Sequence, residues 1–220
     1  MIKPRIVETD NGIQDEGIAV EYDRMMRKDR DNGILYANDI IKYGINGGSV
    51  LEIGQGPGYL GLEWLAKTQN TNLTGIDISD CMVRIAEKNA EEYGFLTKRV
   101  KYIKCDAHEL PFDNESFDNV FSNATIHELR APVKLLNEIN RVLKPGGKYY
   151  LSDLRRDMNP VIRFLMKKST KNKQLVSGLI SSISASYTRK EAEDLLAISD
   201  LKEYKVSVNP FSIFIKGIKN

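Results

Sequence analysis

The sequence predicts an α/β protein built on a doubly wound, mostly parallel sheet. Short apolar runs such as residues 50–53 are typical of strands that are buried on both faces. This first run ends in a glycine loop, residues 54–58, and an apolar helical pattern begins at Tyr59. Two β-rich runs at 204–208 and 211–215, separated by a short turn, predict an antiparallel hairpin at the end of the chain. These observations indicate a nucleotide-binding corner in a mixed sheet.

Composition is that of a globular protein of ordinary size. At 220 residues and 41% hydrophobic content the chain can bury its own core, so we expect a single domain. The net charge of +2 gives no general reason to expect a nucleic-acid partner. No apolar run is long enough to span a bilayer, and the first residues lack the apolar segment of a signal peptide. Cys81 and Cys105 have no metal-ligand spacing, so we expect a cytoplasmic protein with reduced cysteines.

Helical and strand patterns alternate along the chain. Residues 1–18 are expected to form an irregular arm, and residues 19–44 two helices divided at Gly33. A capping box at Thr188 and Glu191 predicts the start of the last helix. Further strands are expected at 72–77, 100–105, 117–123 and 148–154, with helices after Ser79 and from Pro132 to Leu143.

The spacing of the glycine loop bears on which nucleotide binds. A dinucleotide loop reads Gly-x-Gly-x-x-Gly and places a pyrophosphate on a helix N-terminus. Here the spacing is Glu52-x-Gly54-x-Gly56-x-Gly58, with an acid inside the end of the strand. A carboxylate there repels a pyrophosphate but helps to hold a cationic amino-acid ligand, and the loop alone leaves both possibilities open. Asp77 ends the next strand, where a carboxylate can accept both hydroxyls of a ribose in either case.

Taken together, these motifs resemble those of the class I, Rossmann-like S-adenosylmethionine (AdoMet)-dependent methyltransferases, in particular the type 11/25-like small-molecule group. The glycine loop is similar to motif I of that family, Asp106-Ala107 to its adenine motif, and residues 141–147 to the helix-ending turn that feeds its fifth strand. The resemblance implies a seven-stranded, mostly parallel sheet with an antiparallel C-terminal hairpin strand and helices on both faces. It also implies AdoMet as the cofactor, released as S-adenosylhomocysteine.

The resemblance assigns roles to individual residues. Tyr22 is expected near the methionine end of AdoMet, Asp77 on the ribose, Ile78 against the adenine, and Asp106 on the adenine amino group. We expect His108 and Glu109 to be solvated loop residues. The expected cofactor-binding residues are Tyr22, Glu52, Gly54, Gln55, Gly56, Gly58, Asp77, Ile78, Asp106, Ala107 and Asn123.

The same resemblance divides the chain into four parts. Residues 1–47 would form a helical lid, residues 48–154 the AdoMet-binding core, and residues 188–220 a final helix and β-hairpin. Residues 155–187 exceed what the sheet needs and are interpreted as two amphipathic helices that cap the acceptor site.

Methyl transfer from a sulfonium needs positioning more than it needs a reactive side chain. The displacement is in-line, no metal is required, and a base is needed only if the acceptor must lose a proton. His127 is the candidate base because its intrinsic pKa lies near neutrality. Acceptor-binding candidates follow the fourth and fifth strands and the cap: Glu128, Asp153, Arg155, Arg156 and Tyr187.

Several functions remain open at this stage. The leading expectation is a methyltransferase with a small-molecule acceptor, acting as a monomer or homodimer. Asn123-Ala124-Thr125-Ile126 lacks the prolines and aromatic residue of base methyltransferases, which makes nucleic acid an unexpected partner. The alternatives are an RNA or protein methyltransferase that uses the basic segment 155–173, a non-catalytic AdoMet-binding subunit, and a nicotinamide dehydrogenase.

Overall fold

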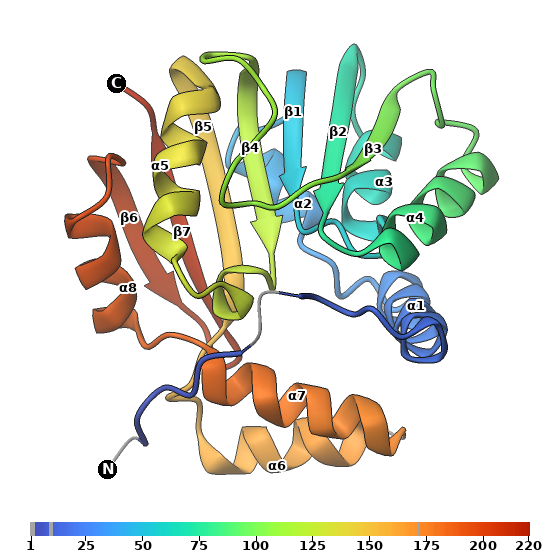
Figure 1. The fold of residues 1–220 in the computed structure, drawn as a ribbon, viewed down its shortest axis with the longest axis vertical. Coiled ribbons are helices and arrows are strands. Elements are labelled where there is room, and N and C mark those ends of the chain that lie inside the picture. The colour runs from blue at the N-terminus through green and yellow to red at the C-terminus, as the bar shows by residue number, and fades with distance from the viewer. Residues whose placement is uncertain (1–2, 9–10, 171) are drawn as a thin grey trace.

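A seven-stranded sheet forms the centre of the computed structural model, which describes residues 3–8, 11–170 and 172–220 (Figure 1). The strand order is β3-β2-β1-β4-β5-β7-β6, and β7 runs antiparallel to both of its neighbours. This confirms the predicted mixed sheet with an antiparallel C-terminal hairpin. The strands are β1 Gly48–Ile53, β2 Thr71–Asp77, β3 Val100–Lys104, β4 Phe117–Asn123, β5 Leu143–Leu154, β6 Glu203–Val208 and β7 Ser212–Ile218.

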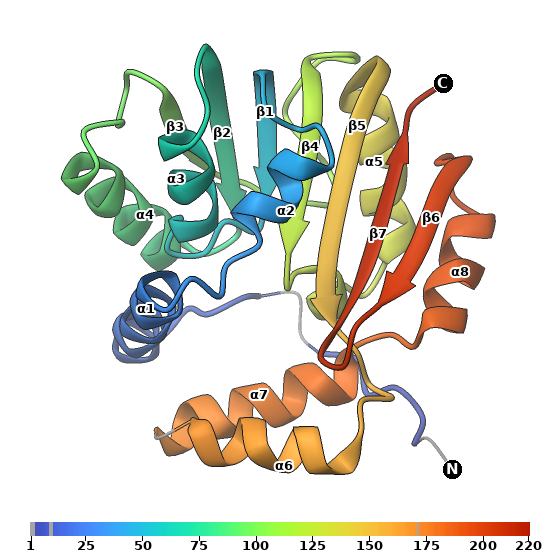
Figure 2. The ribbon, with the colours of Figure 1, turned by 180° about the vertical axis from the view of Figure 1, so that it is seen from behind.

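Helices cover both faces of the sheet, as predicted. Helices α2 and α3 lie on the face seen in Figure 2, and α5 and α8 on the face seen in Figure 1. Alternation along β1 supplies both cores: Val50 packs with Trp64 of α3, and Leu51 packs with Ile139 of α5. The helices are α1 Glu16–Asp31, α2 Ala37–Lys42, α3 Tyr59–Ala66, α4 Asp80–Glu92, α5 Pro132–Val142, α6 Pro160–Ser169, α7 Lys173–Ala185 and α8 Arg189–Ala197, with a 3-10 helix η1 at Ile126–Glu128.

Several boundaries differ from prediction, and two of these differences have clear local reasons. Helix α1 begins at Glu16 rather than residue 19, because the Asp15 side chain accepts a hydrogen bond from Ile18 N and caps it. Strand β5 begins at Leu143 rather than 148, because its Pro-Gly-Gly turn is paired on both sides. Leu143 pairs with Phe117, and Gly146 N donates to Lys219 O at 2.7 Å.

Residues 155–187 form the two helices that the sequence predicted, α6 and α7. In Figures 1 and 2 they lie beyond the C-terminal end of β5, with α7 nearer the sheet and α6 outermost. Lys171, part of the basic segment, lies outside the described residues.

The N-terminal arm is irregular but is held in place. Ile6 N donates to Ser184 O at 3.1 Å, which ties the arm to α7. Arg5 donates to the carbonyls of Ala185 and His127, the latter at 2.8 Å. The arm therefore joins α7 to η1, directly beside His127.

Candidate active site

A cavity of about 1180 Å³ opens at the C-terminal ends of β1, β2, β4 and β5. This edge includes the point between β1 and β4 where the strand order reverses, the usual ligand position in open α/β sheets. Its floor comes from these strand ends and the glycine loop, and its roof from α1, α7 and the N-terminal arm. This volume lies slightly above the range of about 300–1,000 Å³ that is typical of ligand sites.

The glycine loop is fixed by the neighbouring strand. Gly54 N donates to Ile76 O at 2.8 Å, and Gly56 N donates to Asp77 Oδ2 at 3.0 Å. Gly54 has φ +67°, and a Cβ there would lie 2.1 Å from Thr125 Oγ1, so only glycine fits. The Tyr22 ring lies close to the loop, 3.7 Å from where a Gly56 Cβ would be.

Buried polar atoms at the back of the loop are left without partners. Glu52 Oε2 and both amide atoms of Gln55 are buried, line the cavity and make no hydrogen bond among the described residues. Burial raises the pKa of Glu52 well above its usual value. Such groups are costly unless a ligand or water satisfies them. The two oxygens among them, Glu52 Oε2 and Gln55 Oε1, fit the ammonium group of an amino-acid moiety.

Asp77 projects into the same cavity. Its Oδ1 accepts from Ser79 N at 2.9 Å and its Oδ2 from Gly56 N. Burial raises the pKa of Asp77, although these backbone donors oppose the rise. The carboxylate is thus held rigidly in a costly position, as expected of a ligand-binding group. Ile78 lines the cavity next to it.

The adenine-motif residues Asp106 and Ala107 also line the cavity. However, Asp106 Oδ1 accepts from both His108 N and His108 Nδ1, each at 2.8 Å. His108 is therefore not the solvated residue that we expected: its side chain is only 15% exposed because it folds onto Asp106. Glu109 is exposed, as predicted.

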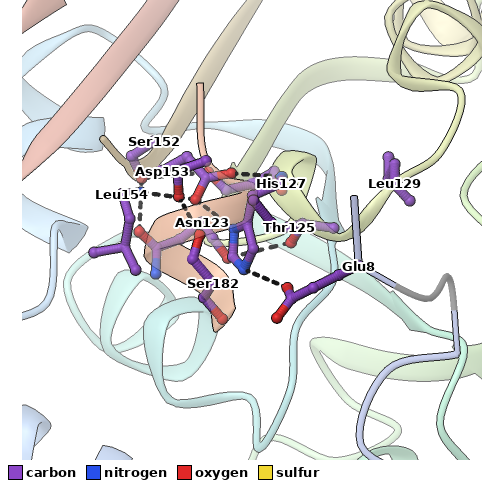
Figure 3. Close-up of polar contacts among 12 residues, drawn as sticks. Glu8, Asn123, Thr125, His127, Leu129, Ser152, Asp153, Leu154 and Ser182 are labelled. Atoms are coloured by element: carbon purple, nitrogen blue, oxygen red, sulfur yellow. Dashed lines mark hydrogen bonds and ion pairs between the residues drawn. The ribbon is translucent and has the colours of Figure 1, made fainter. Parts of the chain in front are cut away.

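A second group of polar residues surrounds His127, which also lines the cavity (Figure 3). His127 Nδ1 contacts Asp153 Oδ1 at 2.6 Å, and His127 N donates to Asp153 Oδ2 at 2.9 Å. His127 Nε2 lies 3.6 Å from Glu8 Oε2 of the arm. Asn123 Oδ1 accepts from Ser152 Oγ at 2.7 Å, which fixes its side chain at the cavity wall.

This setting changes the expected protonation of His127. Burial alone would lower its pKa, but the carboxylates of Asp153, Glu128 and Glu8 outweigh burial and raise the pKa of His127 to about 9. A pKa above neutrality favours the imidazolium form of His127, a hydrogen-bond donor, whereas we expected a neutral base. Burial raises the pKa of Glu128 to about 7, close to that of an effective general base.

The cavity wall is strongly acidic. No Lys or Arg lines it among the described residues, and His127 is its one cationic group there. The carboxyl groups that line it are those of Glu8, Asp29, Glu52, Asp77, Asp106, Glu128 and Asp153. In a partly buried site such a field favours a cationic ligand and disfavours phosphates.

Three acceptor candidates lie outside the cavity. Arg155 forms an ion pair with Asp157 at 2.7 Å and donates to Asn209 O at 3.0 Å. Arg156 donates to Ser186 O at 2.7 Å and pairs with Glu191. The Tyr187 ring is buried under Arg5, 4.2 Å from the guanidinium carbon. None of these three residues lines the cavity, so our expectation that they face the acceptor is corrected.

Other lining residues were not anticipated. Glu8 has no sequence signal, because the arm lacks periodicity. The cavity face of α7 did carry one: small residues recur at helical spacing, at Ser177, Gly178, Ser181 and Ser182.

Comparison with known proteins agrees with this geometry. A methyltransferase-domain family matches residues 46–202, and the chain belongs to that family. Its fold is that of the class I AdoMet-dependent methyltransferases, which confirms the predicted resemblance. An AdoMet-dependent methyltransferase from Aquifex aeolicus superposes with a TM-score of 0.72 at 21% identity, covering 94% of this chain and 100% of that one.

Curated relatives share the central part of the chain. An uncharacterised protein of Methanocaldococcus jannaschii is 36% identical over 141 residues, 63% of this chain and 60% of the relative. The phthiotriol/phenolphthiotriol dimycocerosates methyltransferase of Mycobacterium leprae is 29% identical over 143 residues, 64% of this chain and 51% of the relative. The ubiquinone/menaquinone biosynthesis C-methyltransferase of Blochmanniella pennsylvanica is 31% identical over 132 residues, 53% and 52% respectively. The matches thus span about half the length of these relatives.

Proposed function

We propose that this protein is an AdoMet-dependent methyltransferase with a small-molecule acceptor. The observation that carries the proposal is the acidic cavity, in which a glycine loop, a ribose-type carboxylate and unpartnered buried polar atoms share one wall. AdoMet, when bound, supplies a methyl group that its sulfonium already activates for displacement.

The residues of the cavity wall suit each part of that cofactor. The side-chain oxygens of Glu52 and Gln55 would accept hydrogen bonds from its ammonium group. The Asp77 carboxylate would accept hydrogen bonds from the ribose hydroxyls beside Ile78. Asp106 and Ala107 would meet the adenine, and Tyr22 would close over the loop from α1. The acidic cavity would attract the sulfonium and ammonium groups of AdoMet, whereas it would repel the pyrophosphate of NAD.

The helices that roof the cavity, where the acceptor would bind, contribute several apolar residues to its lining. Met25 and Met26 of α1, Met166 of α6 and Leu175 and Leu179 of α7 line it. Flexible methionines suit an irregular apolar molecule. The two named relatives, a quinone-biosynthesis and a dimycocerosate methyltransferase by name, are consistent with an apolar acceptor.

Proton handling falls to the group around His127. The imidazolium, held by Asp153, would donate a hydrogen bond to the acceptor and orient it. Glu128, with a pKa of about 7, would take a proton from an acceptor that must lose one. An acceptor that is already nucleophilic would need only the orientation.

Calorimetric titration tests this function. The protein should bind AdoMet and S-adenosylhomocysteine at one site and should not bind NAD. Tight binding of NAD with none of AdoMet would mean that the acidic cavity serves another ligand.

The macromolecular alternative finds less support. RNA is strongly anionic, and the cavity wall would repel it. Of the basic residues in the 155–173 segment, Arg155 and Arg156 are engaged in ion pairs within the protein.

A further inference from the structure

The outward face of α6 is apolar, which is unusual for a surface helix. Val161, Phe164 and Leu165 are 64%, 63% and 56% exposed, and their spacing places them on one side of the helix. No residue of α6 is fully buried. Scattered exposed apolar residues are ordinary, but three large ones on one turn and a half of a helix mark an interaction site.

Basic residues surround this apolar face. From Met158 to Tyr187 the sequence contains five of the 32 basic residues of the chain and none of its 30 acidic ones. The remainder of the chain therefore carries a net charge of −3. On α6 itself Lys168 is exposed next to Leu165, and Lys167 lies in the same last turn.

The helix lies at the outer end of the molecule. Figures 1 and 2 show α6 farthest from the sheet, with α7 between it and the strands. Its other side reaches the cavity, where Met166 and Ser169 form part of the lining. The apolar outer face and a part of the cavity lining therefore belong to the same helix.

We propose that α6 docks on an anionic membrane surface, with Val161, Phe164 and Leu165 in the headgroup region and Lys168 against lipid phosphates. A short helix with an apolar face and flanking lysines has the composition of an interfacial helix. Docking would place the cavity beside the lipid phase, the source of an apolar acceptor. Among the described residues no helix is both long and apolar enough to cross a membrane, so this contact is peripheral.

A second copy of the chain fits this face less well. Three side chains of one helix offer much less than the roughly 800 Å² per partner of a stable interface. A two-fold dimer through α6 would also bring two acid-free basic segments together. The small apolar face and the basic segment suit a bilayer instead. A few apolar side chains can insert into a bilayer, and anionic lipids supply negative charge for the lysines.

Vesicle co-sedimentation tests the proposal with the full chain. The probes are vesicles of phosphatidylglycerol with phosphatidylcholine and vesicles of phosphatidylcholine alone. The wild type should bind the anionic vesicles more tightly. The double variant Phe164→Ser/Leu165→Ser should bind them roughly 10- to 100-fold more weakly, because two half-inserted apolar side chains are lost. Lys168→Glu should weaken binding at least about fivefold.

The matched control is Ile198→Ser, which removes an apolar side chain that is 71% exposed at the end of α8. It should bind vesicles like the wild type, and all variants should keep the wild-type melting temperature. Failure of the wild type to bind anionic vesicles would overturn the proposal, as would equal binding by the double variant. A wild-type dimer that the double variant cannot form would assign the face to a second copy. The readout is independent of methyl transfer, so this inference and the proposed function can fail separately.

Discussion

Replacing Asp77 by alanine should separate ligand binding from folding. The substitution removes the carboxylate that would accept two ribose hydroxyls, together with the acceptors for Gly56 N and Ser79 N. Charge-assisted hydrogen bonds in a closed site contribute about 2–3 kcal/mol. The dissociation constant for AdoMet should therefore rise roughly 30- to 150-fold.

The substitution Asp77→Ala should change the stability of the fold much less than it changes the affinity for AdoMet. Burial raises the pKa of Asp77, which means that burying the ionised carboxylate destabilises the ligand-free fold. The hydrogen bonds from its backbone donors offset only part of this destabilisation. The alanine substitution removes those hydrogen bonds, but it also removes the destabilising buried charge. The melting temperature of the ligand-free protein should change by only a few degrees.

Calorimetry with AdoMet and with S-adenosylhomocysteine measures the effect. Asp80→Ala is the matched control, because Asp80 lies three residues further along the chain, is 55% exposed and pairs with Lys104 on the surface. The control should keep the wild-type dissociation constant. A folded Asp77→Ala protein with unchanged affinity would mean that the ribose is held elsewhere.

Three further predictions concern the same cavity and the glycine loop beside it. A nuclear magnetic resonance titration of His127 should give a pKa of about 9, and Asp153→Asn should lower it; a value near 6.5 in the wild type would refute the charge cluster. Because folding raises the pKa of Glu128 from 4.5 to about 7, folding disfavours its ionised form. Glu128→Gln should therefore increase stability above pH 7 and have little effect below about pH 4.5, and a pH-independent difference in melting temperature would contradict this. Gly58→Ala should destabilise the protein by about 1–3 kcal/mol, measured by denaturant unfolding, because φ is +84° and the new Cβ would lie 2.7 Å from Tyr102 Oη; an unchanged midpoint would show that the loop adapts.

Features that depend on local sequence patterns were predicted well from the sequence. The fourth strand was predicted at its exact bounds, 117–123, because apolar and turn residues mark both ends. Gly33 divides the first two helices as expected, since its φ of +68° cannot continue a helix. The placement of Glu52, Asp77 and Asp106 at one sheet edge follows from parallel strands alone.

Predictions failed where long-range contacts determine the outcome. Besides its local ion pair with Asp157, Arg155 donates to the Asn209 carbonyl of the hairpin turn, and no local signal reveals that second contact. The pKa of His127 depends on carboxylates from three separate segments, including Glu8 in an aperiodic arm. Such features need the tertiary structure, because burial and charge there come from residues far apart in the sequence.

Transfer of a labelled methyl group tests the central claim most directly. The protein would be incubated with methyl-labelled AdoMet and an extract of its native cells, and the label followed into organic-soluble, protein and RNA fractions. The acidic, apolar-walled cavity predicts label in a small organic-soluble product, with transfer strongly reduced in Asp77→Ala. Label confined to RNA or protein, or no transfer by a protein that binds AdoMet, would contradict a small-molecule methyltransferase.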